Sequence, residues 1–180
     1  MRKTFLFLAS IVVVLFLVNT SQAKEITIDH ATVQVYYSPN GGCTDAIVKE
    51  IGKAKTEILV QAYSFTSTPI AKALVVAFKR GVKVEAILDK SQRSEKYTSA
   101  SFLANSKIPT FIDDKHSIAH NKIMIIDKQI VITGSFNFTK AAEEHNAENL
   151  LIIPSKELAK EYIENWKTHK NHSTLYEPRY

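Results

Sequence analysis

Apolar and polar residues alternate along the chain with two different periods. Residues 58–63 are almost continuously apolar, which is typical of a buried strand. Over residues 70–78 the apolar positions recur at helical spacing, and this predicts a helix with one buried face. Thr68 is predicted as the N-cap of that helix, Pro69 as its first residue and Gly81 as the residue that follows it.

The rest of the chain continues this alternation of strand and helix. Further strands are predicted at residues 32–37, 82–88, 122–126, 130–133 and 150–153, and further helices at 47–54, 97–104 and 155–170. The runs at 122–126 and 130–133 are close enough to form a hairpin. The alternation predicts an α/β fold of one domain, in which helices flank a mixed, largely parallel β-sheet.

The N-terminus has the organisation of a secretory leader. Arg2 and Lys3 precede a run over residues 5–18 that is apolar except for Ser10, and Ser21-Gln22-Ala23 follows it. This pattern predicts a signal peptide at residues 1–23, cleaved after Ala23, and a mature domain at residues 24–180 in the periplasm or outside the cell. After cleavage no stable membrane association is expected. An uncleaved membrane anchor is the alternative.

Composition places few further limits on function. The chain has 180 residues, 45% hydrophobic and 23% charged, which are ordinary values for a globular domain. The formal net charge of +5 falls to +3 without the leader, because two of the 23 basic residues are Arg2 and Lys3. This mildly basic balance permits nucleic-acid binding. Cys43 is the single cysteine, so no internal disulfide can form, and we expect it to be a small buried residue.

One segment near the middle of the chain combines groups suited to binding a phosphate. His120 and Lys122 are two residues apart, a spacing that puts both side chains on one face of a strand. Ser135 and Asn137 repeat this spacing on the next predicted segment, and Gly134 allows close approach of the backbone. An imidazole, an ammonium, a hydroxyl and an amide would neutralise a phosphate and donate hydrogen bonds to it.

The spacing of these residues resembles the signature of the phospholipase D superfamily. From His120 to Asn137 the chain reads H-x-K-x4-D-x6-G-S-x-N, which agrees with the signature at each defined position. Tyr63-Ser64-Phe65 after a strand and Ala147-Glu148-Asn149 before the last strand extend the likeness over most of the mature chain. The chain is most similar to the short bacterial endonucleases of this superfamily, and residues 24–180 are therefore expected to form a phospholipase D-like nuclease domain.

The resemblance implies a role for each polar residue of the motif. His120 would attack phosphorus and form a phosphohistidine. Lys122 and Asn137 would hold the nonbridging oxygens of the substrate, with Ser135 assisting. These roles imply an exported phosphodiesterase that hydrolyses DNA, with RNA as a second expected substrate.

Two acidic residues complete the implied site. Glu148 matches the residue that orients the catalytic histidine, whereas Asp127 has a largely structural task in the family. No metal ion and no cofactor are implied for catalysis, because Lys122 and its neighbours supply the charge stabilisation that Mg²⁺ provides elsewhere. We therefore expect activity in excess EDTA.

The motif occurs once in this chain, whereas many family members carry two copies. The reaction needs two histidines, one that attacks and one that protonates the leaving oxygen. A C2 homodimer would supply His120 from each subunit. Since two positive imidazoles repel each other, the pair would share one proton, and we expect a bell-shaped dependence of rate on pH.

Two other functions are compatible with the motif. The same chemistry serves a phospholipase D-type hydrolase or transferase acting on phospholipids, although the mature chain has no long apolar insertion for a membrane. A noncatalytic phosphate-binding module is the third hypothesis, and the intact His120, Lys122 and Glu148 argue against it.

The remaining polar residues are given structural interpretations. His116 and His120 are four apart, but no H-E-x-x-H pattern supports a zinc site there. Asp113-Asp114 is interpreted as a turn. The other histidines are expected to be solvated or locally hydrogen-bonded: His30, His145, His169 and His172. Three basic residues are assigned either to phosphate contacts or to a solvated loop: Lys90, Arg93 and Lys96.

Overall fold

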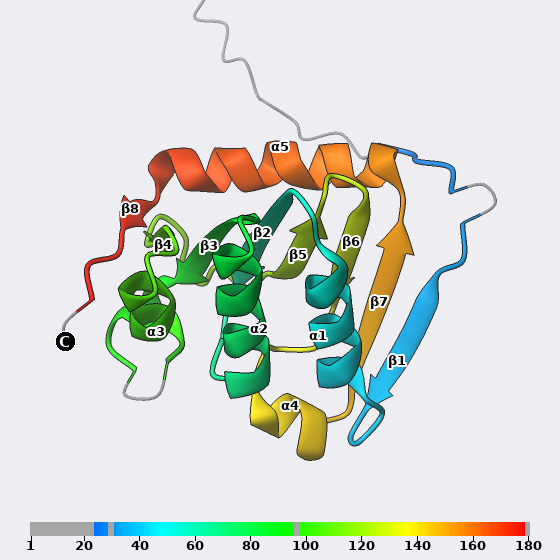
Figure 1. Cartoon of the computed structure of the whole chain (residues 1–180), viewed down its shortest axis with the longest axis horizontal. Coiled ribbons are helices and arrows are strands. Elements are labelled where there is room, and N and C mark those ends of the chain that lie inside the picture. The colour runs from blue at the N-terminus through cyan, green and yellow to red at the C-terminus, as the bar shows by residue number, and fades with distance from the viewer. Residues whose placement is uncertain (1–23, 29–30, 96–97, 179–180) are drawn as a thin grey trace, which may run out of the picture.

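A computed structural model of the chain describes residues 24–28, 31–95 and 98–178. Across these residues eight strands form one sheet, with five α-helices and one 3-10 helix around it (Figure 1). The strands are β1 (Gln34–Ser38), β2 (Glu57–Ala62), β3 (Lys83–Asp89), β4 (Thr110–Asp113), β5 (Lys122–Ile126), β6 (Ile130–Gly134), β7 (Glu148–Pro154) and β8 (Thr174–Leu175). The helices are α1 (Cys43–Lys53), α2 (Thr68–Lys79), η1 (Lys90–Arg93), α3 (Ala100–Asn105), α4 (Lys140–Glu144) and α5 (Lys156–His172).

The sheet is mixed, as predicted, but it is not largely parallel. Its order is β1-β7-β6-β5-β2-β3-β4-β8. Among the described strands only the pairs β2–β3 and β3–β4 are parallel, and the other five pairs are antiparallel. The alternation of strand and helix holds for the first half of the chain. In the second half β6 follows β5 through a short turn and pairs with it antiparallel, and β7 pairs antiparallel with β6 after the segment that contains α4.

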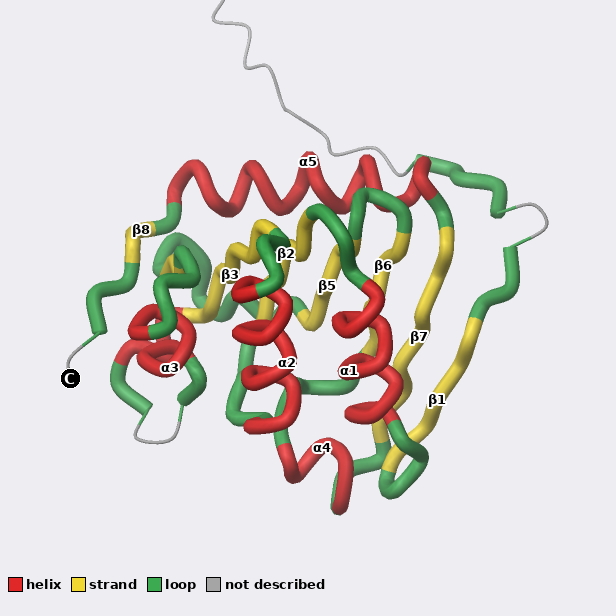
Figure 2. The backbone as a smooth tube through the Cα atoms, viewed as in Figure 1, coloured by secondary structure: helices red, strands yellow, loops and turns green. Residues whose placement is uncertain are grey.

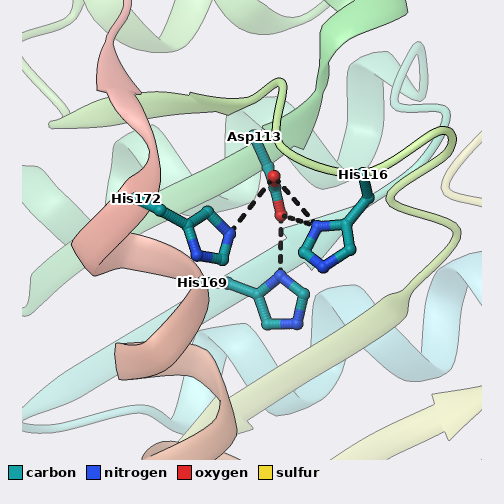
Figure 3. Close-up of side chains that lie close together, drawn as sticks. All are labelled: Asp113, His116, His169 and His172. Carbon is teal, nitrogen blue, oxygen red and sulfur yellow. Dashed lines mark hydrogen bonds and ion pairs between the residues drawn. The ribbon is translucent and has the colours of Figure 1, made fainter.

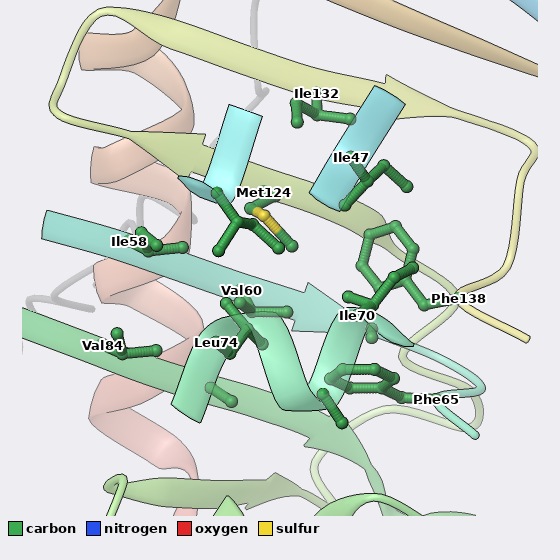
Figure 4. Packing of buried hydrophobic residues seen from close by; sticks show 14 of the residues in the cluster. Ile47, Ile58, Val60, Phe65, Ile70, Leu74, Val84, Met124, Ile132 and Phe138 are labelled. Carbon is green, nitrogen blue, oxygen red and sulfur yellow. The ribbon is translucent and has the colours of Figure 1, made fainter. Parts of the chain in front are cut away.

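The central strands are buried on both faces of the sheet. Alternate residues of β2 face opposite sides, so Ile58 and Val60 belong to one apolar cluster and Leu59 to another. The larger cluster packs the sheet against α1 and α2 (Figure 4), which lie side by side over the strands (Figure 2). The smaller cluster packs the opposite face against α5, where the Trp166 indole N–H donates to the carbonyl of Val60 at 2.9 Å. The single domain is therefore three-layered.

Several local predictions are confirmed and others move by a residue. Helix α2 begins one residue earlier than predicted, with Ser67 as its N-cap and Thr68 already helical. Gly81 follows this helix with a φ of 92°, as expected for a C-terminal glycine. Ser155 caps α5 by accepting a hydrogen bond from the Leu158 N–H at 3.1 Å. Cys43 is fully buried, and burial together with the charge of Glu143 raises the pKa of its thiol to about 11.

The signal peptide at residues 1–23 lies outside the described residues, so the structure does not test it. None of the helices in the described ranges is long and apolar enough to cross a membrane.

Candidate active site

His120 and Lys122 lie at the start of β5, beside Tyr63. His120 is exposed and precedes β5, whereas Lys122 is the first residue of the strand and is buried. The strand begins at Lys122, as predicted, so His120 lies two residues before it. They still share one region: the His120 ring centroid lies 4.5 Å from that of Tyr63, and the Lys122 ammonium lies 5.0 Å from the Tyr63 centroid. Lys122 Nζ also donates to the His120 carbonyl at 2.8 Å.

The pairing of β2 with β5 explains why Tyr63 lies here. Strands β2 and β5 are antiparallel with Ala62 opposite Lys122, so the end of β2 adjoins the start of β5. The Tyr63 N–H donates to the Asn121 carbonyl at 2.8 Å, which extends the pairing by one step. The pairing of β2 with β5 thus places the Tyr63 ring against the segment that contains His120 and Lys122.

Gly134 and Ser135 are fitted closely against β7. Gly134 has a φ of 148°, and a Cβ on it would lie 2.3 Å from the Asn149 carbonyl oxygen. The close approach that glycine permits is therefore to a neighbouring strand. The Ser135 hydroxyl accepts a hydrogen bond from the Asn149 N–H at 3.0 Å, and its own proton can still be donated.

Asn137 carries an unsatisfied polar atom. Its side-chain oxygen is buried and has no hydrogen-bond partner within the described part of the chain. Buried amide groups are normally paired, and an exception requires an explanation. The oxygen is an acceptor, so the donor that could contact a phosphate oxygen is the amide nitrogen of Asn137.

The positions of the two acidic residues differ from each other. Glu148 begins β7 and accepts a hydrogen bond from the Asn146 amide at 3.2 Å; among the described residues it has no hydrogen bond to His120. Burial lowers the pKa of the Lys122 ammonium, and the negative charge of Glu148 offsets part of this effect. Glu148 therefore acts electrostatically on the site, and its orienting role towards His120 stays a prediction.

Asp127 lies at the opposite end of β5 and holds the backbone. Its carboxylate accepts hydrogen bonds from the N–H groups of Lys55, Thr56 and Glu57, at 2.7–3.2 Å. The Thr56 hydroxyl also donates to it, at 2.8 Å. Burial raises the pKa of Asp127, but these hydrogen bonds outweigh burial and the net pKa is lowered. This residue therefore connects the β5–β6 turn to the start of β2.

An open pocket of about 440 Å³ adjoins the segment that contains His120 and Lys122. On the sheet side its walls include His120, Lys122 and Gly134, and α5 contributes Glu161, Tyr162 and Asn165. No motif in the sequence marks the three α5 residues. Their only common signal is helical spacing, which says nothing about the element that the helix covers.

A second polar cluster lies outside the predicted motif. Asp113 ends β4 rather than forming a turn, and its buried carboxylate faces the rings of His116, His169 and His172 (Figure 3). Burial raises the pKa of Asp113, but the interactions with these three histidines outweigh it and lower the pKa to about 2. The interpretation of His169 and His172 as solvated or locally hydrogen-bonded is therefore wrong, because both face Asp113, which is 56 residues before His169 in the sequence. The paired spacings D-x-x-H and H-x-x-H are the sequence signal that could have revealed the cluster.

Lys90 and Arg93 donate hydrogen bonds to segments that are distant in the sequence. Lys90 Nζ donates to the His116 carbonyl at 3.0 Å, and the Arg93 guanidinium donates to the Thr174 hydroxyl at 2.9 Å. Lys96 lies outside the described residues. The two described residues thus have partners within the chain.

Comparison with known proteins connects this architecture with phosphodiester chemistry. Residues 47–170 match the family model described as cardiolipin synthase, PLD-like domain. A Rickettsia conorii protein named phospholipase D is 45% identical over 143 residues, which are 79% of this chain and 72% of that protein. Nuc from Salmonella typhimurium, a phospholipase D family member, is similar in structure with a TM-score of 0.79 and 41% identity, covering 82% of this chain and 99% of Nuc.

A further solved structure agrees in fold alone. NucT from Helicobacter pylori has a TM-score of 0.75 and 24% identity, over 82% of this chain and all of NucT. The mixed sheet, its flanking helices and the His-Lys motif define a phosphodiester hydrolase. The chain belongs to the phospholipase D superfamily.

Proposed function

We propose that this chain is an exported, metal-independent endonuclease that hydrolyses DNA through a phosphohistidine on His120. The observation that carries the proposal is an exposed imidazole and a buried ammonium that line one open pocket. The likeness to Nuc covers nearly the whole of that protein, and the sequence resembles the short bacterial endonucleases of the superfamily. RNA contains the same phosphodiester and is included as a substrate.

The proposed reaction has two steps. In the first, a neutral ring nitrogen of His120 attacks phosphorus, and the bond to the leaving alkoxide breaks as that oxygen receives a proton from an imidazolium. In the second, water attacks the phosphohistidine, gives its proton to the same acid–base imidazole, and releases His120 with a phosphomonoester. Lys122 and Asn137 hold the nonbridging oxygens, and Ser135 donates to one of them.

The acid–base imidazole is supplied by His120 of the partner subunit in a C2 homodimer. One chain has one motif, so a single copy lacks the second histidine. A twofold axis beside His120 would bring both imidazoles to one phosphorus atom. The exposure of His120 supports an end of the sheet that a second chain completes.

A second candidate function is phospholipid hydrolysis or transfer. It is favoured by the relatives in Rickettsia, which are 39–45% identical and carry the name phospholipase D. The bond cleaved and the roles of His120 and Lys122 would be unchanged. Only the group next to the phosphate would differ.

One experiment separates the two substrates. The mature chain is incubated in excess EDTA with plasmid DNA, and separately with vesicles of phosphatidylcholine and cardiolipin. His120→Ala serves as the inactive variant, and His145→Ala as a matched control because His145 is exposed and outside the motif. Plasmid cleavage that depends on position 120 supports the proposal. Turnover of phospholipid alone, or no turnover of either substrate, contradicts it.

Export and assembly need their own measurements. The mass of the N-terminus of protein recovered from cells tests cleavage after Ala23, and an intact Met1 would exclude it. Sedimentation at assay concentrations tests the dimer, and full activity of a monomer would exclude the shared site.

A further inference from the structure

Three histidines from two distant parts of the chain converge on one buried carboxylate (Figure 3). The Asp113 side chain is fully buried at the end of β4. His169 Nδ1 lies 2.7 Å from Asp113 Oδ2, His116 Nδ1 lies 3.1 Å from the same oxygen, and His172 Nε2 lies 3.3 Å from Oδ1. One nitrogen of each ring therefore faces the carboxylate.

The local backbone explains how these groups are presented. His169 and His172 are three residues apart in the last turn of α5, so they share one face of the helix. His116 is three residues after Asp113, in the segment that leads from β4 to β5. One D-x-x-H pair, Asp113 and His116, thus meets one H-x-x-H pair, His169 and His172.

Hydrogen bonding does not account for the whole arrangement. His172 Nε2 is buried and makes no hydrogen bond within the described residues, although it lies close to the carboxylate. The three rings are nearly equidistant, with centroids 4.9, 5.2 and 5.4 Å apart. The hydrogen bonds from His116 and His169 already pair the carboxylate, so they do not explain why a third ring nitrogen faces it.

The geometry is close to that of a four-coordinate metal centre. One ligand atom from each of the four residues lies within 4.8 Å of the others. Around tetrahedral zinc, with bonds of about 2.0–2.1 Å, ligand atoms lie roughly 3.3 Å apart. Small movements of the four side chains would bring their ligand atoms to this spacing. Three imidazole nitrogens and one carboxylate oxygen are a donor set that zinc accepts. The His116 side chain is 44% exposed and offers a path for entry, whereas Asp113 is shielded from water.

We propose that Asp113, His116, His169 and His172 bind one Zn²⁺ ion, each through one atom, at a structural site separate from the catalytic residues. The ion would fasten the C-terminal turn of α5 to the segment that continues from His116 to His120. It would therefore stabilise the fold and the catalytic loop, while the chemistry at phosphorus proceeds without it. This inference does not depend on the substrate of the enzyme.

The test measures metal binding directly. The untagged mature chain is stripped with a chelator, desalted and titrated with Zn²⁺ by calorimetry, and with Co²⁺ by visible absorption. We expect one ion per chain, a strong absorption typical of four-coordinate Co²⁺, and a rise in Tm of roughly 5–10 °C when free Zn²⁺ is about a hundredfold above its Kd.

Variants assign the ligands. His116→Ala is the variant least able to disturb folding, because that side chain is partly exposed, and His172→Ala tests the helix side of the site. Each should weaken binding by at least about tenfold, whereas His145→Ala should bind as the unmutated chain does.

Two outcomes would overturn the proposal. One is no saturable binding to the unmutated chain; the other is binding that both cluster variants retain in full. Either result would leave an ion-pair cluster only. The plasmid and vesicle assays are run in EDTA and well below the Tm of the metal-free chain, so they measure turnover without the ion, whereas the titrations measure binding alone.

Discussion

The two ends of strand β5 belong to the same motif but differ in how their side chains are paired. At the end after Ile126, the Asp127 carboxylate receives hydrogen bonds from three backbone N–H groups and one hydroxyl. At the start of the strand, the His120 ring makes no hydrogen bond among the described residues, and Asn137 of the same motif has an unpaired buried oxygen.

This difference separates structural from chemical roles within the motif. A side chain with a full set of partners in its own chain stabilises the fold, and its loss leaves buried donors unpaired. A polar side chain without hydrogen-bond partners in its own chain does not stabilise the fold. Its presence is explained by a contact with a ligand. Substitutions at the two ends should therefore affect different measurements.

The largest effect is expected at position 120. His120→Ala should lower the initial rate on the hydrolysed substrate by about 10⁴-fold or more, because the nucleophile is removed. The Tm should stay unchanged, since the ring makes no hydrogen bond that the fold would lose. Initial rates and thermal melts of the same preparations check this. A variant that keeps more than about a tenth of the activity would contradict the role of His120 as nucleophile.

A smaller loss is expected at Lys122. Lys122→Met keeps most of the side-chain volume but removes the charge near the substrate oxygens, and should lower kcat by about 10²–10³-fold. Because burial lowers the pKa of this ammonium, the charged form is disfavoured in the fold, and the substitution should not lower the Tm. Lys128→Met, at an exposed turn residue, is the control. A parallel loss of Tm and kcat would indicate a structural role instead.

Gly134 tests the close contact between β6 and β7. Gly134→Ala should destabilise the chain by about 3 kcal/mol, because the new Cβ meets backbone at 2.3 Å and the φ is unfavourable for alanine. Urea unfolding at neutral pH measures this. Gly52→Ala is a matched control inside α1, where a Cβ meets nothing within 4 Å and a slight gain in stability is expected.

The smallest effect is expected at Asp127, and it depends on pH. Asp127→Ala should lower the free energy of unfolding by about 2 kcal/mol at pH 7, with little change in the activity of the folded protein. The folded-state pKa of Asp127 is lowered, so its contribution is present above about pH 4 and disappears as the pH falls through the folded-state pKa.

Urea unfolding at pH 7 and near pH 3 therefore measures both parts of this prediction. The difference between the variant and the unmutated chain should shrink at the lower pH. Asp114→Ala removes an exposed carboxylate and should have little effect at either pH. A difference that stays constant with pH would show that the Asp127 charge is not responsible.

Much of the fold is predictable because the signals are local. The apolar run of β2, the helical period of α2 and the β5–β6 hairpin are all present where the sequence predicts them. The short elements β4, α4 and β8 were not predicted, because two to five residues give no period to detect. The direction of pairing was also beyond the sequence, since an apolar strand fits a parallel or an antiparallel neighbour.

The catalytic site was predictable to the extent that it lies in one segment. His120, Lys122, Ser135 and Asn137 are found by spacing within eighteen residues, whereas Tyr162 and Asn165 reach the pocket from α5. The Asp113 cluster shows the same limit more sharply. Asp113 and His169 are 56 residues apart and come together only because α5 packs across the sheet.

By itself, the sequence determined the periodic elements, the motif and the superfamily, because each is a pattern among residues close together in the chain. The tertiary structure alone decided which groups are paired and which are left open: Asp127 is satisfied, Asn137 is not, and three histidines surround one carboxylate. The physical reason is that hydrogen bonds and metal ligands depend on positions in space to within a few tenths of an ångström, and packing between distant segments sets those positions.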